Sequence, residues 1–167
     1  MKRLLQGSLI ALCLLLTLPC CAAKRRSSHN QEKPVKQLVK ATSVQWEGYN
    51  TAVEQSKKDH KFIGLFFTGS DWCIWCTKME EQILSSPEFT KFSKEHLHMV
   101  EVDFPQANSL PEDVRQQNQT LKTKYGVNGF PTLVFIDGNG TEKARMGFEY
   151  GGGENYVKKI KAALNKK

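Results

Sequence analysis

Two cysteines separated by two residues, Cys73 and Cys76, are the residues in this sequence most suited to chemistry. They follow an apolar run at 62–68 and precede a helix-like pattern. If Cys73 opens that helix, its sulfur lies among free backbone N–H groups at the positive end of the helix dipole, which favours the thiolate over the thiol. Cys76 follows one turn later on the same side and can form a disulfide with Cys73. The pair could be a redox dithiol, half of a metal site or a structural disulfide.

The other cysteines and the histidines narrow these alternatives. The remaining three cysteines lie within residues 13–21, so a mature chain cut after Ala23 keeps only Cys73 and Cys76. A zinc site needs two further ligands, and none of the four histidines has ligand spacing to the cysteines. A disulfide between such close residues constrains little of the unfolded chain. We therefore prefer a redox dithiol without a metal ion, and keep a zinc half-site and an inert disulfide as alternatives.

Residues 1–23 have the pattern of a secretory signal peptide. A positively charged start precedes a leucine-rich run at 9–18, and small residues follow up to Ala23. The run is shorter than the roughly 20 residues that a membrane-spanning helix needs. Cys20 and Cys21 resemble a degenerate lipoprotein processing site, so a lipid anchor on one of them is an alternative to cleavage after Ala23. These features predict an exported protein, in the periplasm of a bacterium.

The formal net charge of +7 lies in the first 40 residues. Lys2 and Arg3 supply two of these charges and residues 24–40 a net five, so residues 41–167 are neutral. This distribution predicts a basic flexible tether at 24–41. Alternatively, this segment has a function of its own and binds an anionic membrane surface electrostatically. The neutral remainder gives no reason to expect a nucleic-acid partner. Residues 42–167 suffice for one well-buried domain.

Strand and helix patterns alternate along that domain. The continuous apolar run at 62–68 predicts a strand buried on both faces, Ser86-Pro87 predicts a helix start, and the turn at 137–140 predicts a hairpin. The expected helices cover about 49–59, 73–84, 86 onward, 111–125 and 154 onward, and the expected strands cover 62–68, 98–104, 132–136 and 142–148. This order predicts an α/β fold with a mixed central sheet, helices on both faces, and an antiparallel C-terminal hairpin whose strands lie at the edge. Trp46 is expected in the core.

Two motifs resemble the thioredoxin-fold family. The first is Trp-Cys-Ile-Trp-Cys at 72–76, and the second, about 55 residues later, is Tyr-Gly-Val-Asn-Gly-Phe-Pro-Thr-Leu at 125–133. The resemblance extends over 44–165. The signal sequence, the longer insert around 105–120 and the pattern at 70–80 are similar to periplasmic thioredoxin-like proteins of the DsbH type.

The resemblance implies roles for particular residues. Cys73 would be the exposed nucleophile and Cys76 the resolving thiol of a redox-active disulfide. Phe130 would offer backbone groups to an incoming substrate strand, and Pro131 would be the cis-proline that shapes the groove. Trp72 is expected to pack beside the active site.

The sequence departs from the family pattern at two points. The usual Gly-Pro between the cysteines is Ile74-Trp75, which we interpret as an apolar docking surface for substrates. The buried acidic residue that thioredoxins commonly have six positions before the first cysteine is Phe67. Another group or water must therefore take the proton of the second cysteine, and Asp71 is too close in sequence to Cys73 to be assigned that role.

Together these features predict an exported thiol–disulfide oxidoreductase that reduces substrate disulfides with the Cys73–Cys76 dithiol. It would need no cofactor, and its partners would be disulfide-containing exported proteins and an upstream membrane thiol that donates electrons. We expect a monomer. A disulfide oxidase, an isomerase if the protein is dimeric, and a thioredoxin-fold chaperone or binding module with an incidental dithiol are the alternatives.

Overall fold

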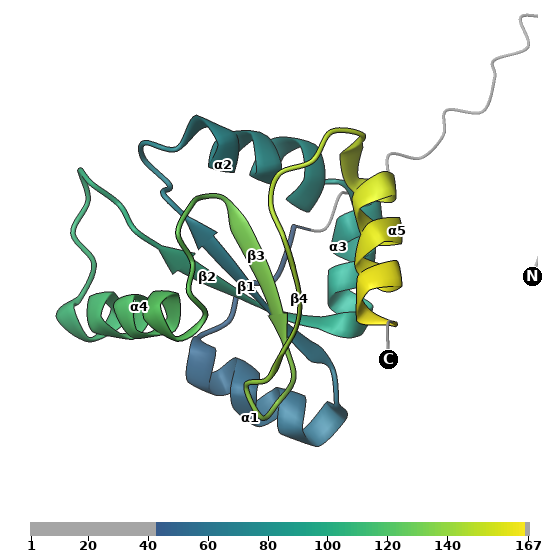
Figure 1. The fold of residues 1–167 in the computed structure, drawn as a ribbon, viewed down its shortest axis with the longest axis horizontal. Coiled ribbons are helices and arrows are strands. Elements are labelled where there is room, and N and C mark those ends of the chain that lie inside the picture. The colour runs from purple at the N-terminus through teal and green to yellow at the C-terminus, as the bar shows by residue number, and fades with distance from the viewer. Residues whose placement is uncertain (1–42, 166–167) are drawn as a thin grey trace, which may run out of the picture. The chain divides into compact units, whose positions relative to one another are not determined.

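The computed structural model describes residues 43–165. In this part of the chain the strands form one sheet, and helices pack against it (Figure 1). The expected signal peptide, tether and lipid-anchor cysteines lie outside the described residues. None of the helices within 43–165 is both long and apolar enough to cross a membrane.

The sheet is mixed and has the strand order β2-β1-β3-β4. Its strands are β1 (Phe62–Thr68), β2 (Leu97–Asp103), β3 (Thr132–Ile136) and β4 (Glu142–Met146). β1 pairs with β2 in parallel and with β3 in antiparallel fashion, and β3 and β4 form the antiparallel hairpin that the turn at 137–140 predicts. The expectation that both hairpin strands lie at the edge is wrong for β3, because β3 pairs with β1 on one side and β4 on the other. The edge strands are β2 and β4.

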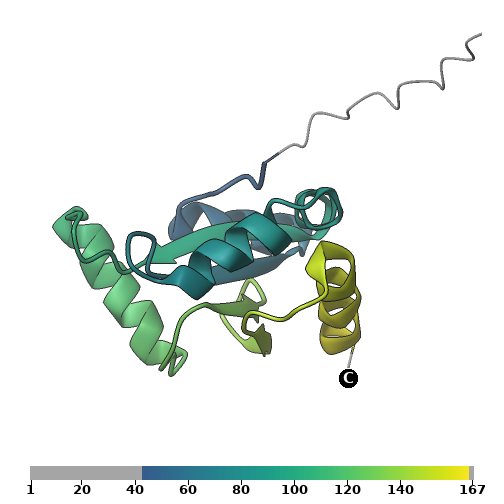
Figure 2. The same cartoon turned by 90° about the horizontal axis from the view of Figure 1, so that it is seen from above.

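The helices cover both faces of this sheet. They are α1 (Tyr49–Asp59), α2 (Ile74–Met79) with its π-helical continuation η1 (Glu80–Leu84), α3 (Pro87–His96), α4 (Glu112–Lys124) and α5 (Gly152–Leu164). One buried cluster joins the sheet to α2, α3 and α5, and a second joins it to α1 and α4. Figures 1 and 2 show α4 and α5 at opposite sides of the sheet. Neighbouring residues of β1 belong to different layers, since Phe66 is in the first cluster and Phe67 in the second.

The helix expected at 73–84 changes its hydrogen bonding after one and a half turns. From Glu80 the chain continues as a π-helix, which ends where the Ser85 N–H bonds to the Glu80 carbonyl at 2.8 Å. A π turn holds one residue more than an α turn. Ile83 and Leu84, which lie in this wider turn, are both buried.

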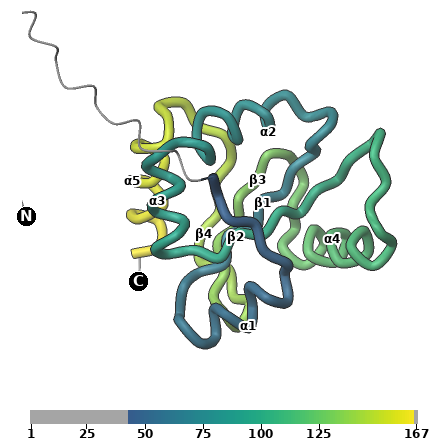
Figure 3. Tube along the Cα trace, turned by 180° about the vertical axis from the view of Figure 1, so that it is seen from behind, coloured from purple at the N-terminus to yellow at the C-terminus, as the bar shows by residue number. Residues whose placement is uncertain are grey.

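Trp46 is not a core residue, contrary to expectation. It precedes α1 in a segment that runs past edge strand β2, seen from behind in Figure 3, and forms an isolated parallel bridge with Met99. One face of its indole stacks on Phe66, with ring centroids 6.0 Å apart, while 40% of the residue stays exposed. The segment lies outside the sheet edge, so only one side of the ring is covered.

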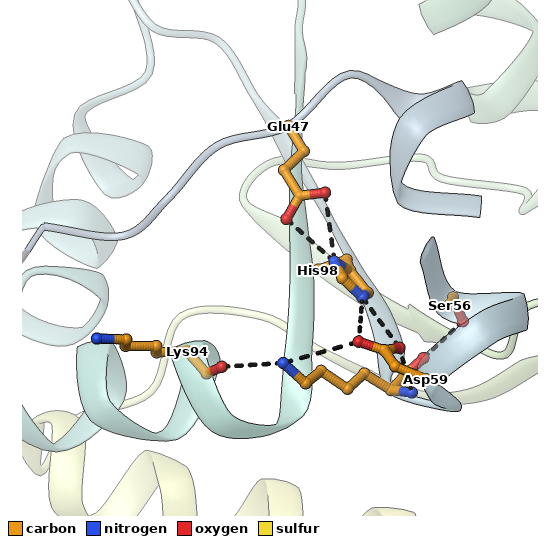
Figure 4. A network of polar contacts seen from close by, with 6 residues as sticks. Glu47, Ser56, Asp59, Lys94 and His98 are labelled. Atoms are coloured by element: carbon orange, nitrogen blue, oxygen red, sulfur yellow. Dashed lines mark hydrogen bonds and ion pairs between the residues drawn. The ribbon is translucent and has the colours of Figure 1, made fainter. Parts of the chain in front are cut away.

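A charged network fastens the same segment to β2 and α1 (Figure 4). His98 is 7% exposed, and a carboxylate faces each of its ring nitrogens. Nδ1 lies 3.0 Å from Glu47 Oε1, and Nε2 lies 3.1 Å from Asp59 Oδ2. Both nitrogens can donate only in the imidazolium form. Burial alone would raise the pKa of Asp59, but the Lys61 backbone N–H and His98 outweigh burial and lower the pKa.

We expect His98→Leu to lower the free energy of unfolding by about 1–3 kcal/mol, because it leaves two carboxylates facing a buried apolar side chain. Chemical denaturation at pH 6 measures this change. His96→Leu is the matched control, because His96 is exposed. A loss of unfolding free energy equal to that of the control would contradict the network's role. The loss caused by His98→Leu should be smaller in a protein that already carries Glu47→Gln and Asp59→Asn.

Candidate active site

Cys73 and Cys76 are joined by a disulfide, with their Cα atoms 5.2 Å apart. Cys73 is the N-cap of α2, in an extended conformation, so the helix begins one residue later than the cysteine. Its sulfur accepts the backbone N–H of Cys76 at 3.2 Å, and its carbonyl oxygen accepts the same group at 2.9 Å. Cys73 is 8% exposed and Cys76 is fully buried. Within the pair, only Cys73 can be reached from solvent.

Phe130 and Pro131 lie in the loop before β3, and the peptide bond between them is cis. Phe130 packs against the buried cluster that contains both cysteines. Its ring meets Trp72 edge to face at 5.8 Å and stacks on Phe104 at 5.2 Å. The structure therefore brings the two sequence motifs together through aromatic contacts.

Trp72 is held at both sides of its indole. Its Nε1–H donates to the Phe104 carbonyl at 2.8 Å, and its ring packs so closely on Gly69 that a Cβ there would lie 2.6 Å from the indole nitrogen. The residue is nevertheless 45% exposed. Position 69 must be glycine to admit this ring, and the ring in turn flanks Cys73.

A hydrogen-bonded clamp ties the loop before Cys73 to the end of β2 and the loop that follows. Ser70 donates its N–H and its hydroxyl to Asp103, at 2.9 and 2.6 Å. The Asp71 carboxylate accepts three consecutive backbone N–H groups at 2.9, 2.7 and 3.2 Å; these belong to Gln106, Ala107 and Asn108. These bonds, that of Gln106 first, lower the pKa of Asp71. Asp71 therefore fastens the loop at 105–108, the first part of the insert around 105–120, to the site, a function that its sequence position did not reveal.

Ile74 and Trp75 are exposed, at 63% and 43%, beside the disulfide. Trp75 also contacts two aromatic residues that sequence analysis missed, Phe148 at 5.4 Å and Tyr150 at 6.5 Å between ring centroids. The amine of Lys78 lies 4.3 Å from the Trp75 ring centroid. The one sequence feature that could have drawn attention to Phe148 and Tyr150 is their position before a run of three glycines.

Phe67, which replaces the usual acidic residue of the family, is fully buried. It lies in the cluster between the sheet and helices α1 and α4, on the opposite face of the sheet from α2. Carboxyl groups with a raised pKa occur elsewhere, at the half-buried Glu80 and at Glu101 on β2. Burial, and then the charge of neighbouring acidic groups, raises the pKa of each. Glu80 follows Cys76 by one helical turn and is the first carboxyl group after it along the chain.

Comparison with known proteins gives a consistent set of relatives. The family model described as "Thioredoxin-like domain" matches residues 49–162. "Disulfide bond reductase DsbH" of Chlamydia pneumoniae is 60% identical over 164 residues, covering 98% of both chains. "Thioredoxin-related protein DsbJ" of the same organism is 33% identical over 106 residues, which cover 63% of this chain and 30% of the relative. The solved structure "DsbH Oxidoreductase" superimposes with a TM-score of 0.75 at 57% identity, covering 87% of this chain and 100% of that chain.

We expect Asp71→Asn to loosen the loop at 105–108, because an amide oxygen without charge accepts these N–H groups less strongly. Hydrogen exchange should be several-fold faster at the amides of Gln106, Ala107 and Asn108. In the parent protein this protection should be present above the ordinary aspartate pKa of 3.8 and be lost as the pH falls through the lowered pKa. Asp113→Asn, in the first turn of α4, is the control, and unchanged exchange in Asp71→Asn would contradict the clamp.

Proposed function

Because the chain belongs to the family of thioredoxin-like domains, we propose that it is an exported thiol–disulfide oxidoreductase that reduces disulfides in other exported proteins. The observation that carries this proposal is the Cys73–Cys76 disulfide, placed at the cap of α2 with only Cys73 accessible. The reducing direction is supported by the relative that is 60% identical over 98% of both chains and is named a disulfide bond reductase.

In the reaction that we propose, the reduced protein starts with Cys73 as a thiolate. Its sulfur attacks one sulfur of the substrate disulfide, the substrate S–S bond breaks, and the other substrate sulfur leaves as a thiolate. Cys76 then loses its proton and attacks Cys73, which releases the second substrate sulfur and closes the Cys73–Cys76 disulfide. Two electrons pass to the substrate, and its two thiolates take up protons from solvent. The disulfide form of the structure corresponds to the end of this cycle.

The N-cap position supports the first step. The Cys76 N–H donates to the Cys73 sulfur, and this bond is stronger to a thiolate than to a thiol. Burial favours the division of roles, because the fully buried Cys76 is reached only from Cys73.

We assign substrate binding to the surface around Cys73. The backbone of Phe130, beside the cis bond to Pro131, would pair with an extended substrate segment, as the family resemblance implies. Trp72, Ile74 and Trp75 would surround that segment with apolar side chains.

The proposed cycle needs a source of electrons, because an exported dithiol that reduces its substrates must itself be reduced again. We propose that this source is a membrane protein that carries a thiol pair, and the cycle as written uses no cofactor. We propose that the protein acts in the periplasm as a monomer, after export by its N-terminal segment or while held there by a lipid on Cys20 or Cys21.

The two cysteines should respond differently to substitution. Cys73→Ser should abolish reduction of insulin disulfides, because the attacking sulfur is gone. Cys76→Ser should instead accumulate mixed disulfides with substrates, visible on non-reducing gels, because nothing releases them. Gln82→Ala, on the exposed side of η1, is the control and should keep full activity. Insulin reduction by Cys73→Ser would refute the mechanism.

The direction of the reaction can be tested by equilibrating the Cys73–Cys76 couple with glutathione. A reductase should have a potential nearer the roughly −270 mV of thioredoxin than the roughly −120 mV of DsbA. A value near that of DsbA would make the protein an oxidase.

A further inference from the structure

A second group of aromatic residues stands beside Cys73, built from two segments more than 70 residues apart. It consists of Trp75, Phe148 and Tyr150, which we call the aromatic wall. All three pairs of rings are in contact, at 5.4 Å for Trp75–Phe148, 6.5 Å for Trp75–Tyr150 and 5.2 Å for Phe148–Tyr150. Phe148 also packs against the core cluster that contains both cysteines, which ties the wall to the site.

The chain on either side of Tyr150 is anchored, although the side chain itself is 75% exposed. Asn155 donates its side-chain amide to the Tyr150 carbonyl at 3.2 Å, and Gly151 follows in the left-handed region at φ 109°. Before it, the Gly147 carbonyl accepts the hydroxyl of the buried Tyr156 at 3.1 Å. Tyr150 is therefore presented to solvent by a fastened segment.

Exposed apolar side chains in this part of the molecule are concentrated at one place. The large apolar residues that are exposed within residues 43–165 are Trp46, Trp72, Ile74, Trp75 and Tyr150. All except Trp46 belong to the wall or to the residues adjoining Cys73. A concentration of apolar surface at one point of a protein marks a site of interaction.

The proposed reaction indicates which part of the substrate contacts the aromatic wall. In the mixed disulfide the substrate cysteine is bonded to Cys73, and its chain neighbours have Cα atoms only about 3.8 Å from its own. Ile74 and Trp75 directly follow Cys73, so a side chain beside the substrate cysteine is within reach of the wall. The occupant is therefore the substrate segment that flanks the disulfide.

We propose that the aromatic wall is a side-chain subsite that receives an aromatic or long aliphatic residue adjacent to the substrate cysteine. The subsite makes the protein select disulfides that lie in apolar segments. This inference rests on the proposed reductase function and adds to it a class of substrate and two residues, Phe148 and Tyr150, from outside both sequence motifs.

The test compares reduction of three disulfides by the reduced full-length protein and its Tyr150→Ser variant. Two are peptides that differ only in the residue after one cysteine, phenylalanine or serine, and the third is hydroxyethyl disulfide. Tyr150→Ser should lower kcat/KM for the phenylalanine peptide about tenfold, which corresponds to about 1.4 kcal/mol. It should change kcat/KM less than about twofold for the serine peptide and for hydroxyethyl disulfide.

Two further variants separate the subsite from a structural effect. Tyr150→Leu should restore most of the selectivity, because it returns an apolar side chain to the wall. Trp46→Ser removes another exposed aromatic ring outside the wall and should leave the ratio between the two peptides unchanged.

Equal losses on both peptides would overturn the subsite. So would a wild-type dimer that Tyr150→Ser converts to a monomer without altering peptide preference, because the wall would then be an interface between copies of the chain. A wild-type protein that reduces none of the three disulfides would instead refute the proposed function itself.

Discussion

The hydrogen bond from the Cys76 N–H to the Cys73 sulfur is the interaction on which the site depends. It forms only because Cys73 caps α2 in an extended conformation, with φ −92° and ψ 98°, and does not enter the helix. The loop before it must therefore be held in place. Ser70 bonds to Asp103 at the end of β2, and Trp72 bonds to Phe104 directly after it. The register of β2 with β1 places Asp103 opposite Thr68. The sheet thus positions the sulfur through two loops at one end of neighbouring parallel strands.

Local patterns were sufficient to predict most of the elements. The apolar run of β1, the capping serine of α3 and the turn of the β3–β4 hairpin each depend on energies within a few residues. The same holds for the cysteine pair, because the spacing along one helical turn brings the two sulfurs together. The structure confirms these predictions, with boundaries that differ by one or two residues.

Features that join distant segments were not predictable from such patterns. Three features depend on which distant segments the tertiary fold brings together. They are the antiparallel pairing of β3 with β1, the bonds from the loop at 105–108 to Asp71, and the position of Tyr150 beside Trp75. Trp46 is a further example of a residue whose environment the local sequence did not predict. Its apolar character predicted burial, whereas its position outside edge strand β2 leaves one side of its ring exposed.

Opposing effects act on the Cys73 sulfur, and their balance distinguishes this site from the family pattern. Aromatic and aliphatic neighbours exclude water, which disfavours a thiolate, whereas the Cys76 N–H and the start of the helix favour it. Replacing Gly-Pro by Ile74-Trp75 strengthens the first effect and leaves the second intact, since the helix still begins after Cys73. With Phe67 in place of the family's buried acidic residue, that position carries no negative charge. The carboxyl group that follows Cys76 most closely in sequence, Glu80, is only half-buried. The apolar surroundings that disfavour the charge are also the surface to which we assign substrate binding, so under that proposal the same side chains would set both the affinity for substrate and the reactivity of the sulfur.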